Sequence, residues 1–288
     1  MPGVSTGFEG TTGLYVRGGT PDQNLILLDG ATVYNASHLF GFQSVFDPNA
    51  IKDIKFIKGG FPARYGGRLS SIIDITMKEG NKMERKGEFT LGLINSSILM
   101  EGPIKKGKSA YMASARAAYL GLLLLPTYFA SRKQDDKPFN TLLSYDLNFK
   151  VNHEFSNRDK IFFSIYLGQD AYLTQYKVDS TLFGTNLGWG NRTVNLRYIK
   201  SFSNQWFGNT YFNFNTYNLQ ENFSQQGVKD EETTGYFRQS NIKEWSLKQH
   251  FSTAITPKFS FFGGIEIQKS NFYLLMLLLN RQITILLI

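Results

Sequence analysis

From Ser144 onward, apolar and polar residues alternate one by one along the chain. Tyr145 and Leu147 would lie on one face of an extended strand, and Asp146 and Asn148 on the other. A strand with one apolar and one polar face is half buried, because successive side chains point to opposite sides. Repeated amphipathic strands of about ten residues are typical of a transmembrane β-barrel.

The alternation predicts about eight strands, near 88–101, 109–119, 143–155, 160–170, 190–202, 206–219, 240–255 and 258–272. Short connectors are expected at 102–108, 156–159, 203–205 and 256–257, and long ones at 120–142, 171–189 and 220–239. Short turns on one side and long loops on the other are the layout of outer-membrane barrels, whose turns lie in the periplasm. A soluble β-sandwich also has alternating strands. Long loops that recur on only one side argue against a sandwich.

Composition excludes several other classes of protein. The chain has 288 residues, 42% of them hydrophobic, and its purely apolar runs, such as Leu122–Pro126, are short. A membrane-spanning helix needs about 20 apolar residues, so any membrane span must consist of strands. The absence of cysteine excludes disulfides, thiol nucleophiles and zinc–thiolate sites. The net charge of +8 is scattered and forms no basic stripe, so no nucleic-acid partner is expected.

One segment resembles a nucleotide-binding loop. Gly102–Ser109 satisfies G-x-x-x-x-G-K-S, which requires a strand before it and a helix after it. Ala110–Leu120 is rich enough in alanine to form that helix, but Pro103 is unusual and the following residues read as β. A turn between two strands is therefore favoured, and nucleotide binding stays an alternative.

No catalytic or metal site is apparent. His38, His153 and His250 have no partner at metal-ligand spacing, and no G-x-S-x-G motif is present. We therefore expect no enzyme activity, no metal and no cofactor.

The first region, residues 1–80, reads as mixed α/β with many glycines. Candidate strands lie at 24–30, 51–57 and 71–77, and a charged linker follows at 81–87. Residues 88–272 would form the barrel strands. Residues 273–288 do not alternate and form an apolar tail. We expect this tail to result from a truncated or frame-shifted reading frame, and a genuine terminal strand is the alternative.

Three ordered motifs in the first region carry a family resemblance. They are Gly13–Gly30 (GLYVRGGTPDQNLILLDG), Val33–Asn35 and Ile57–Ser71 (IKGGFPARYGGRLSS). Together they closely resemble the plug domain of TonB-dependent outer-membrane receptors, in a variant like that of Bacteroidetes-type bacteria. The resemblance covers roughly residues 3–80 and continues more diffusely through the strands as barrel.

The resemblance implies an active importer in the bacterial outer membrane. Its plug occludes a wide barrel, and a TonB-type energy-transducing protein pulls on the plug to open a path. The expected partners are that protein, outer-membrane lipid and a scarce nutrient such as a siderophore, cobalamin, glycan or peptide. A passive porin or adhesin barrel is the alternative. Because family barrels of about 22 strands enclose a plug and eight strands cannot, the chain is expected to be a fragment.

Carried over onto this sequence, the resemblance also implies two sets of site residues. The outward-facing plug loops are expected to contact ligand first, at Thr20, Pro21, Asp22, Gln23, Tyr34, Asn35 and His38. The alternative is that these residues pack beneath the barrel loops. A charge inside a lumen needs a partner. Three plug arginines, Arg17, Arg64 and Arg68, are therefore expected to pair with inward carboxylates such as Glu101, Asp146 or Glu154.

Overall fold

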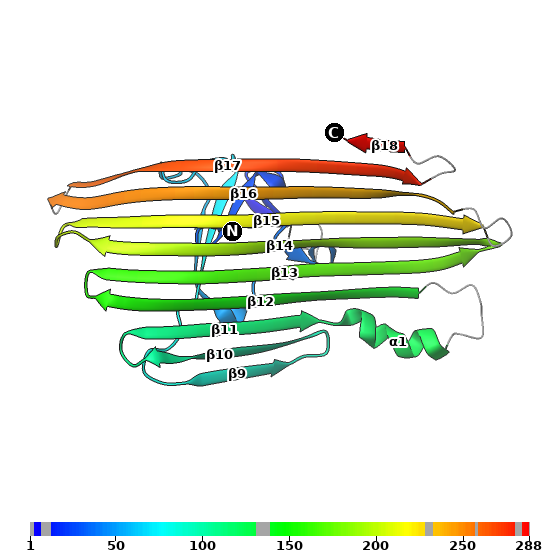
Figure 1. Ribbon diagram of the computed structural model, residues 1–288, viewed down its shortest axis with the longest axis horizontal. Helices are drawn as coiled ribbons and strands as arrows, with labels where there is room; N and C mark the ends of the chain where they lie inside the picture. Colours follow the sequence, from blue (N-terminus) through cyan, green and yellow to red (C-terminus); the bar gives the residue numbers. More distant parts are fainter. Residues whose placement is uncertain are drawn as a thin grey trace.

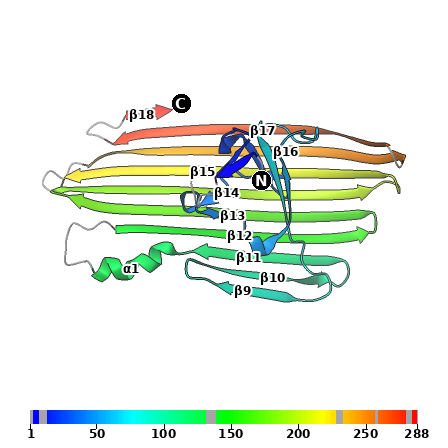
Figure 2. The same cartoon turned by 180° about the vertical axis from the view of Figure 1, so that it is seen from behind.

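A computed structural model describes residues 3–6, 13–130, 139–227, 233–256, 259–279 and 284–287. One large antiparallel sheet dominates the structure, and a small N-terminal domain lies against one of its faces (Figures 1 and 2). The expected fold class, a small domain followed by part of an antiparallel barrel, is confirmed.

The large sheet, called the wall from here on, has ten strands in the order β18-β17-β16-β15-β14-β13-β12-β11-β10-β9. The strands are β9 (Lys86–Leu91), β10 (Asn95–Lys105), β11 (Ser109–Ala118), β12 (Phe139–Ser156), β13 (Asp159–Val178), β14 (Thr181–Ser201), β15 (Trp206–Gly227), β16 (Thr233–Thr256), β17 (Phe259–Leu279) and β18 (Thr284–Leu287). Each strand pairs antiparallel with its neighbour in the sequence. Since β9 and β18 form the two edges, the wall is a partial barrel that does not close on itself.

Several strands are longer than predicted. The expected loop 171–189 is instead the continuation of β13 and β14, which pair up to Val178 and Thr181. Likewise, β15 continues to Gly227 and β16 starts at Thr233, within the expected loop 220–239. The outward face explains the error, because its apolar residues give way to polar ones partway along each strand. Paired outward positions are apolar at Val194, Phe214 and Trp245 and polar at the next outward row, Arg192, Thr216 and Lys243.

Two further segments correct the predicted strands and loops. The single expected strand 88–101 is divided into β9 and β10 by a turn at 92–94, and the expected loop 120–142 begins with helix α1 (Leu120–Ala130). Of the described helices, none combines the length and apolar character that a membrane crossing requires. The expected turn at Pro257 and residues 131–138, 280–283 and 288 lie outside the described residues.

The nucleotide-loop alternative is wrong. Gly102–Ser109 comprises the end of β10, a turn and the first residue of β11, as the strand–turn–strand prediction has it. The alanines after it belong to β11, because they pair with β10 on one side and β12 on the other. No helix N-terminus is therefore available at this segment to bind a phosphate.

The N-terminal domain is built on a four-stranded sheet with the order β4-β3-β8-β7. These strands are β3 (Asn24–Leu28), β4 (Ala31–Thr32), β7 (Ile51–Ile57) and β8 (Ser71–Met77), and β3 runs parallel to β8. Two small sheets join β1 (Val4–Thr6) to β2 (Leu14–Val16) and β5 (Ser37–His38) to β6 (Gln43–Ser44). The helical segments among its described residues are the 3₁₀ segments η1 (Pro21–Gln23), η2 (Leu39–Gly41) and η3 (Pro48–Ala50).

An apolar core fixes this domain on the wall. The strand Asn24–Leu28 is apolar on both faces, which is typical of a central strand covered on both sides. On one face, Leu28 and Met77 belong to a buried cluster that also contains Met112 and Tyr166 of the wall. The hydrophobic core is therefore shared between the two parts of the chain and sets their relative position.

Candidate functional site

The wall turns a polar face toward the N-terminal domain. Between positions 144 and 152 of β12 the inward side chains are all polar and all at most 6% exposed, namely Ser144, Asp146, Asn148, Lys150 and Asn152. Buried polar side chains are costly unless they find partners. The contacts between this face and the domain therefore form the candidate functional site.

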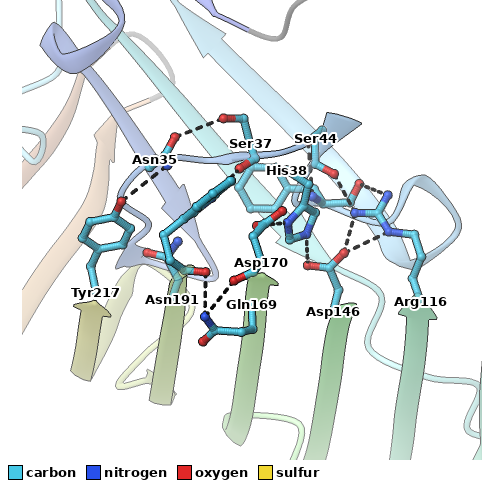
Figure 3. Close-up of polar contacts among 12 residues, drawn as sticks. Asn35, Ser37, His38, Ser44, Arg116, Asp146, Gln169, Asp170, Asn191 and Tyr217 are labelled. Carbon is cyan, nitrogen blue, oxygen red and sulfur yellow. Dashed lines mark hydrogen bonds and ion pairs between the residues drawn. The ribbon is translucent and has the colours of Figure 1, made fainter. Parts of the chain in front are cut away.

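His38 lies at the centre of the contact, placed there by β5 (Figure 3). Its Nδ1 lies 2.5 Å from Asp170 Oδ2, and its Nε2 lies 2.7 Å from Asp146 Oδ1. A neutral imidazole has only one N–H, so donating to two carboxylates requires the doubly protonated ring. Burial disfavours the charged ring, but the hydrogen bonds and charges of Asp146 and Asp170 outweigh it and raise the pKa of His38 to about 9.

Arg116 on β11 completes this group. Its Nε and Nη2 donate to Asp146 Oδ2 at 2.9 and 2.5 Å, and Nη2 also donates to the carbonyl of Ser44 at 2.6 Å. The Tyr166 hydroxyl donates to Asp146 Oδ1 at 2.9 Å. Two carboxylates thus face two cations in a buried, charge-balanced group, called the His38 cluster from here on: His38, Arg116, Asp146, Tyr166 and Asp170.

A second ion pair lies at the turn after β3. Lys150 Nζ contacts Asp29 Oδ1 at 2.6 Å and the carbonyl of Met77 at 3.1 Å. The wall amides of Asn195 and Asn213 donate to the carbonyls of Asp29 and Gly30 respectively. Gly30 has φ of +94°, and a Cβ there would lie 3.2 Å from the ring of Tyr211. Glycine is therefore required where the turn approaches the wall.

The segment that follows is bonded to the wall through Tyr34. Its amide donates to Asn191 Oδ1 at 2.9 Å, and Asn191 Nδ2 donates back to its carbonyl at 2.6 Å. Its hydroxyl donates to Glu244 Oε2 at 2.8 Å, and burial together with this carboxylate raises the pKa of Tyr34 above its usual range. Asn35 Nδ2 donates to the Tyr217 hydroxyl at 3.4 Å (Figure 3).

These contacts place the residues expected to meet ligand. Tyr34, Asn35 and His38 all bond to wall side chains, and His38 is only 1% exposed. Thr20, Pro21 and Asp22 are exposed at η1, whereas Gln23 is half-buried. Ligand contact by this exposed segment stays a prediction.

The described ion pairs do not include the expected arginine pairs. Asp146 pairs with Arg116 and His38, and Glu154 pairs with Lys82 and Lys160. Among the described residues, none of the four residues Arg17, Arg64, Arg68 and Glu101 takes part in an ion pair. The reason is geometric, because Arg64 and Arg68 lie on the loop between β7 and β8 and line a cavity on the other side of the domain sheet.

Sequence reasoning did not identify the wall partners of the domain. Arg116, Asp170, Asn191 and Glu244 are absent from the expected site, although each lies on the polar face of its strand. A buried charge at an inward position was the available signal. The two partners of His38 lie more than 100 residues away from it in the sequence. Local sequence patterns carry no information on such pairs.

Comparison with known proteins agrees with this geometry. Residues 1–71 match the family described as "TonB-dependent Receptor Plug Domain", so the N-terminal domain is a plug domain. The ferric yersiniabactin uptake receptor FyuA from Yersinia pestis has a TM-score of 0.58 and 11% identity, over 100% of this chain and 56% of that one. FpvA of Pseudomonas aeruginosa has a TM-score of 0.64 and 13% identity, over 96% of this chain and 39% of that one.

The siderophore receptor PirA from Pseudomonas aeruginosa is also similar, with a TM-score of 0.52, 13% identity and coverage of 96% and 54%. Identities this low establish the fold alone. The chain spans about half the length of FyuA and PirA and less of FpvA. No curated protein matches the sequence. The Bacteroidetes-type variant stays a prediction.

Proposed function

We propose that this chain, a TonB-dependent receptor plug domain seated on part of an outer-membrane barrel, belongs to a receptor that imports a scarce nutrient by energy-coupled displacement of the plug. One observation carries the proposal: the plug lies on the inner face of the wall and is held by buried polar contacts. Its partner is a TonB-type energy-transducing protein.

The nature of these contacts suits a plug that must move. A buried ion pair gains little net free energy, because both groups are well solvated when they are separated. Withdrawal of the plug would expose Lys150 with Asp29, and the His38 cluster, to water that solvates them. The interface is therefore specific in geometry without being held by apolar burial alone.

The outward face suits a lipid environment. Large apolar side chains alternate there and are substantially exposed, for example Leu147, Phe212, Leu247 and Ile267. Apolar surface this extensive on a sheet with a polar inner face marks contact with hydrocarbon. The chain is an outer-membrane protein by its plug domain and its partial-barrel fold.

For the cargo we propose a ferric siderophore. FyuA is a ferric yersiniabactin uptake receptor, PirA is a siderophore receptor, and the FpvA structure is a complex with pyoverdine and iron. Their fold likeness supports this class ahead of cobalamin, a glycan or a peptide, which the sequence alone leaves open.

The test is transport by the full-length gene product. Expressed in a bacterium that lacks its own siderophore receptors, it should support uptake of a ferric siderophore, and a protonophore should abolish that uptake. Uptake that continues at the same rate after the proton gradient is collapsed would overturn the proposal and favour a passive porin.

A further inference from the structure

A cavity of about 510 Å³ lies between the plug and the wall, on the opposite side of the plug sheet from the His38 cluster. The plug contributes the loop between β7 and β8, with Arg64 and Arg68, and the wall contributes residues near the ends that meet in short turns, such as Arg197 and Phe262. This volume is within the range of small-molecule sites, about 300–1,000 Å³.

The carboxylates around the cavity are already engaged. Asp29 pairs with Lys150, Glu266 with Lys248 and Glu79 with Lys52. The remaining two accept hydrogen bonds: Asp74 from the Tyr65 hydroxyl at 2.7 Å, and Glu244 from Tyr34 and Thr32. Three of the five carboxylates of the lining are therefore ion-paired, whereas Asp74 and Glu244 have only neutral hydrogen-bond donors.

Three guanidinium groups of the lining have no such carboxylate. Arg64, Arg68 and Arg197 enter no ion pair within the described part of the chain. Arg64 Nε is buried and meets no acceptor among those residues. Arg197 donates to Asn209 Oδ1, and Arg68 to the carbonyl of Gly67. Both of these acceptors are neutral. Three guanidinium groups outside any described ion pair thus share the lining with two such carboxylates, Asp74 and Glu244, so positive charge is in excess.

Aromatic rings hold two of these groups in place. Arg64 lies 4.8 Å from the ring centroid of Tyr65 and 5.6 Å from that of Phe262. Arg197 lies 5.1 Å from the ring centroid of Tyr211 and 5.8 Å from that of Phe162. A guanidinium over an aromatic face keeps its N–H edges free for a planar oxyanion, which it binds through two hydrogen bonds.

We infer that this cavity is an oxyanion site for a small molecule that carries two or more carboxylate or phosphate groups. That such a molecule is the cargo, held here between capture outside and release inside, rests on the proposed function. The binding itself does not, because it follows from the unpaired arginines and the cavity.

Citrate is the probe for the test, and its uncharged trimethyl ester is the control ligand. Calorimetry on the whole 288-residue chain, folded in detergent micelles, should show citrate binding and no ester binding. The double variant R64Q/R197Q should bind citrate about tenfold more weakly or worse, since each charge-assisted pair is worth about one order of magnitude.

R192Q is the matched control variant, because Arg192 lies on β14 like Arg197 but is exposed on the outward face. It should bind citrate as the unchanged chain does. R68Q alters a loop residue that, among the described residues, donates a hydrogen bond only to a neighbouring carbonyl. It therefore tests the site even if the double variant fails to fold, and it should also weaken binding.

Equal binding of citrate and its ester, equal losses in R192Q and R64Q/R197Q, or no citrate binding to the folded chain would each overturn the inference. The outcomes separate the two proposals. Arginine-dependent citrate binding by a receptor whose uptake ignores the proton gradient would keep the site and reject the transport function, and energised uptake without citrate binding would do the reverse.

Discussion

His38 bonds to two carboxylates on two neighbouring strands through the two nitrogens of one ring. Its pKa of about 9 in the docked plug exceeds the value of about 6.5 expected in an unfolded chain. The stabilisation is therefore complete below about pH 6.5 and is lost as the pH rises through about 9. This pKa difference corresponds to about 3 kcal/mol of folding stability. The figure needs no reduction for solvent screening, because the ring is almost fully buried.

The first prediction follows from the direction of this pH dependence. Unfolding of the chain in micelles, measured by denaturant at a series of pH values, should show stability falling by a few kcal/mol from about pH 7 to about pH 10. His38→Gln should remove most of that pH dependence. A profile that is the same in the variant and the unchanged chain would show that another group titrates.

A second prediction concerns the loss of the cation. His38→Ala leaves the two carboxylates of the buried His38 cluster with one of its two cations, Arg116, which should destabilise docking by about 3–5 kcal/mol. Protease resistance of the plug is a suitable measure. His153→Ala, which loses one hydrogen bond to Ser109, should cost only about 1 kcal/mol. Equal protease sensitivity of the two variants would count against the cluster.

At the scale of single elements, β13 and β14 show why strands were predicted well near the short turns and poorly beyond them. Near those turns the outward face is apolar and the inward face polar, so the sequence pattern is strong. Past the row of Arg192 and Thr216 the outward face consists mostly of glycine and polar residues, and the strands persist because their backbone hydrogen bonds continue to Val178 and Thr181. Pairing with a neighbour, which a single sequence does not display, decides the structure there.

The turn that connects β13 to β14, called the tip of this hairpin, supports a third prediction. Asp179 adopts a positive φ of 52° in the connection between Val178 and Thr181. Asp179→Gly should preserve the tip, whereas the β-branched Asp179→Val should strain it by about 1 kcal/mol or more. Hydrogen exchange at the paired amides on either side should therefore accelerate only in the valine variant. Identical exchange in both variants would show that the turn conformation does not hold the tip.

For the whole molecule, the sequence predicts more of the architecture than of the site. Glycine-rich motifs between Gly13 and Ser71 and the recurring amphipathic strands together predict a plug and a partial barrel. The contacts between them could not be predicted, because each joins residues far apart in the chain, such as Asp29 with Lys150 or Tyr34 with Glu244. The expected pairing of Arg64 and Arg68 with inward carboxylates is also a long-range contact, and no such ion pair occurs among the described residues.

The central claim is that the plug rests against the wall and must leave it for transport. The sequence has no cysteine of its own, so a pair introduced as Asn35→Cys and Tyr217→Cys, at positions whose side chains are in hydrogen-bond contact, can be joined by a reducible thiol cross-linker. Thr210→Cys with Gln249→Cys gives a control pair within the wall alone.

Energy-dependent uptake by the full-length receptor, measured before cross-linking, after it and after reduction, tests that claim most directly. The account predicts that joining plug to wall stops uptake, that reduction restores it, and that the control pair leaves it unchanged. Full uptake by receptors whose plug is completely cross-linked to the wall would contradict the account.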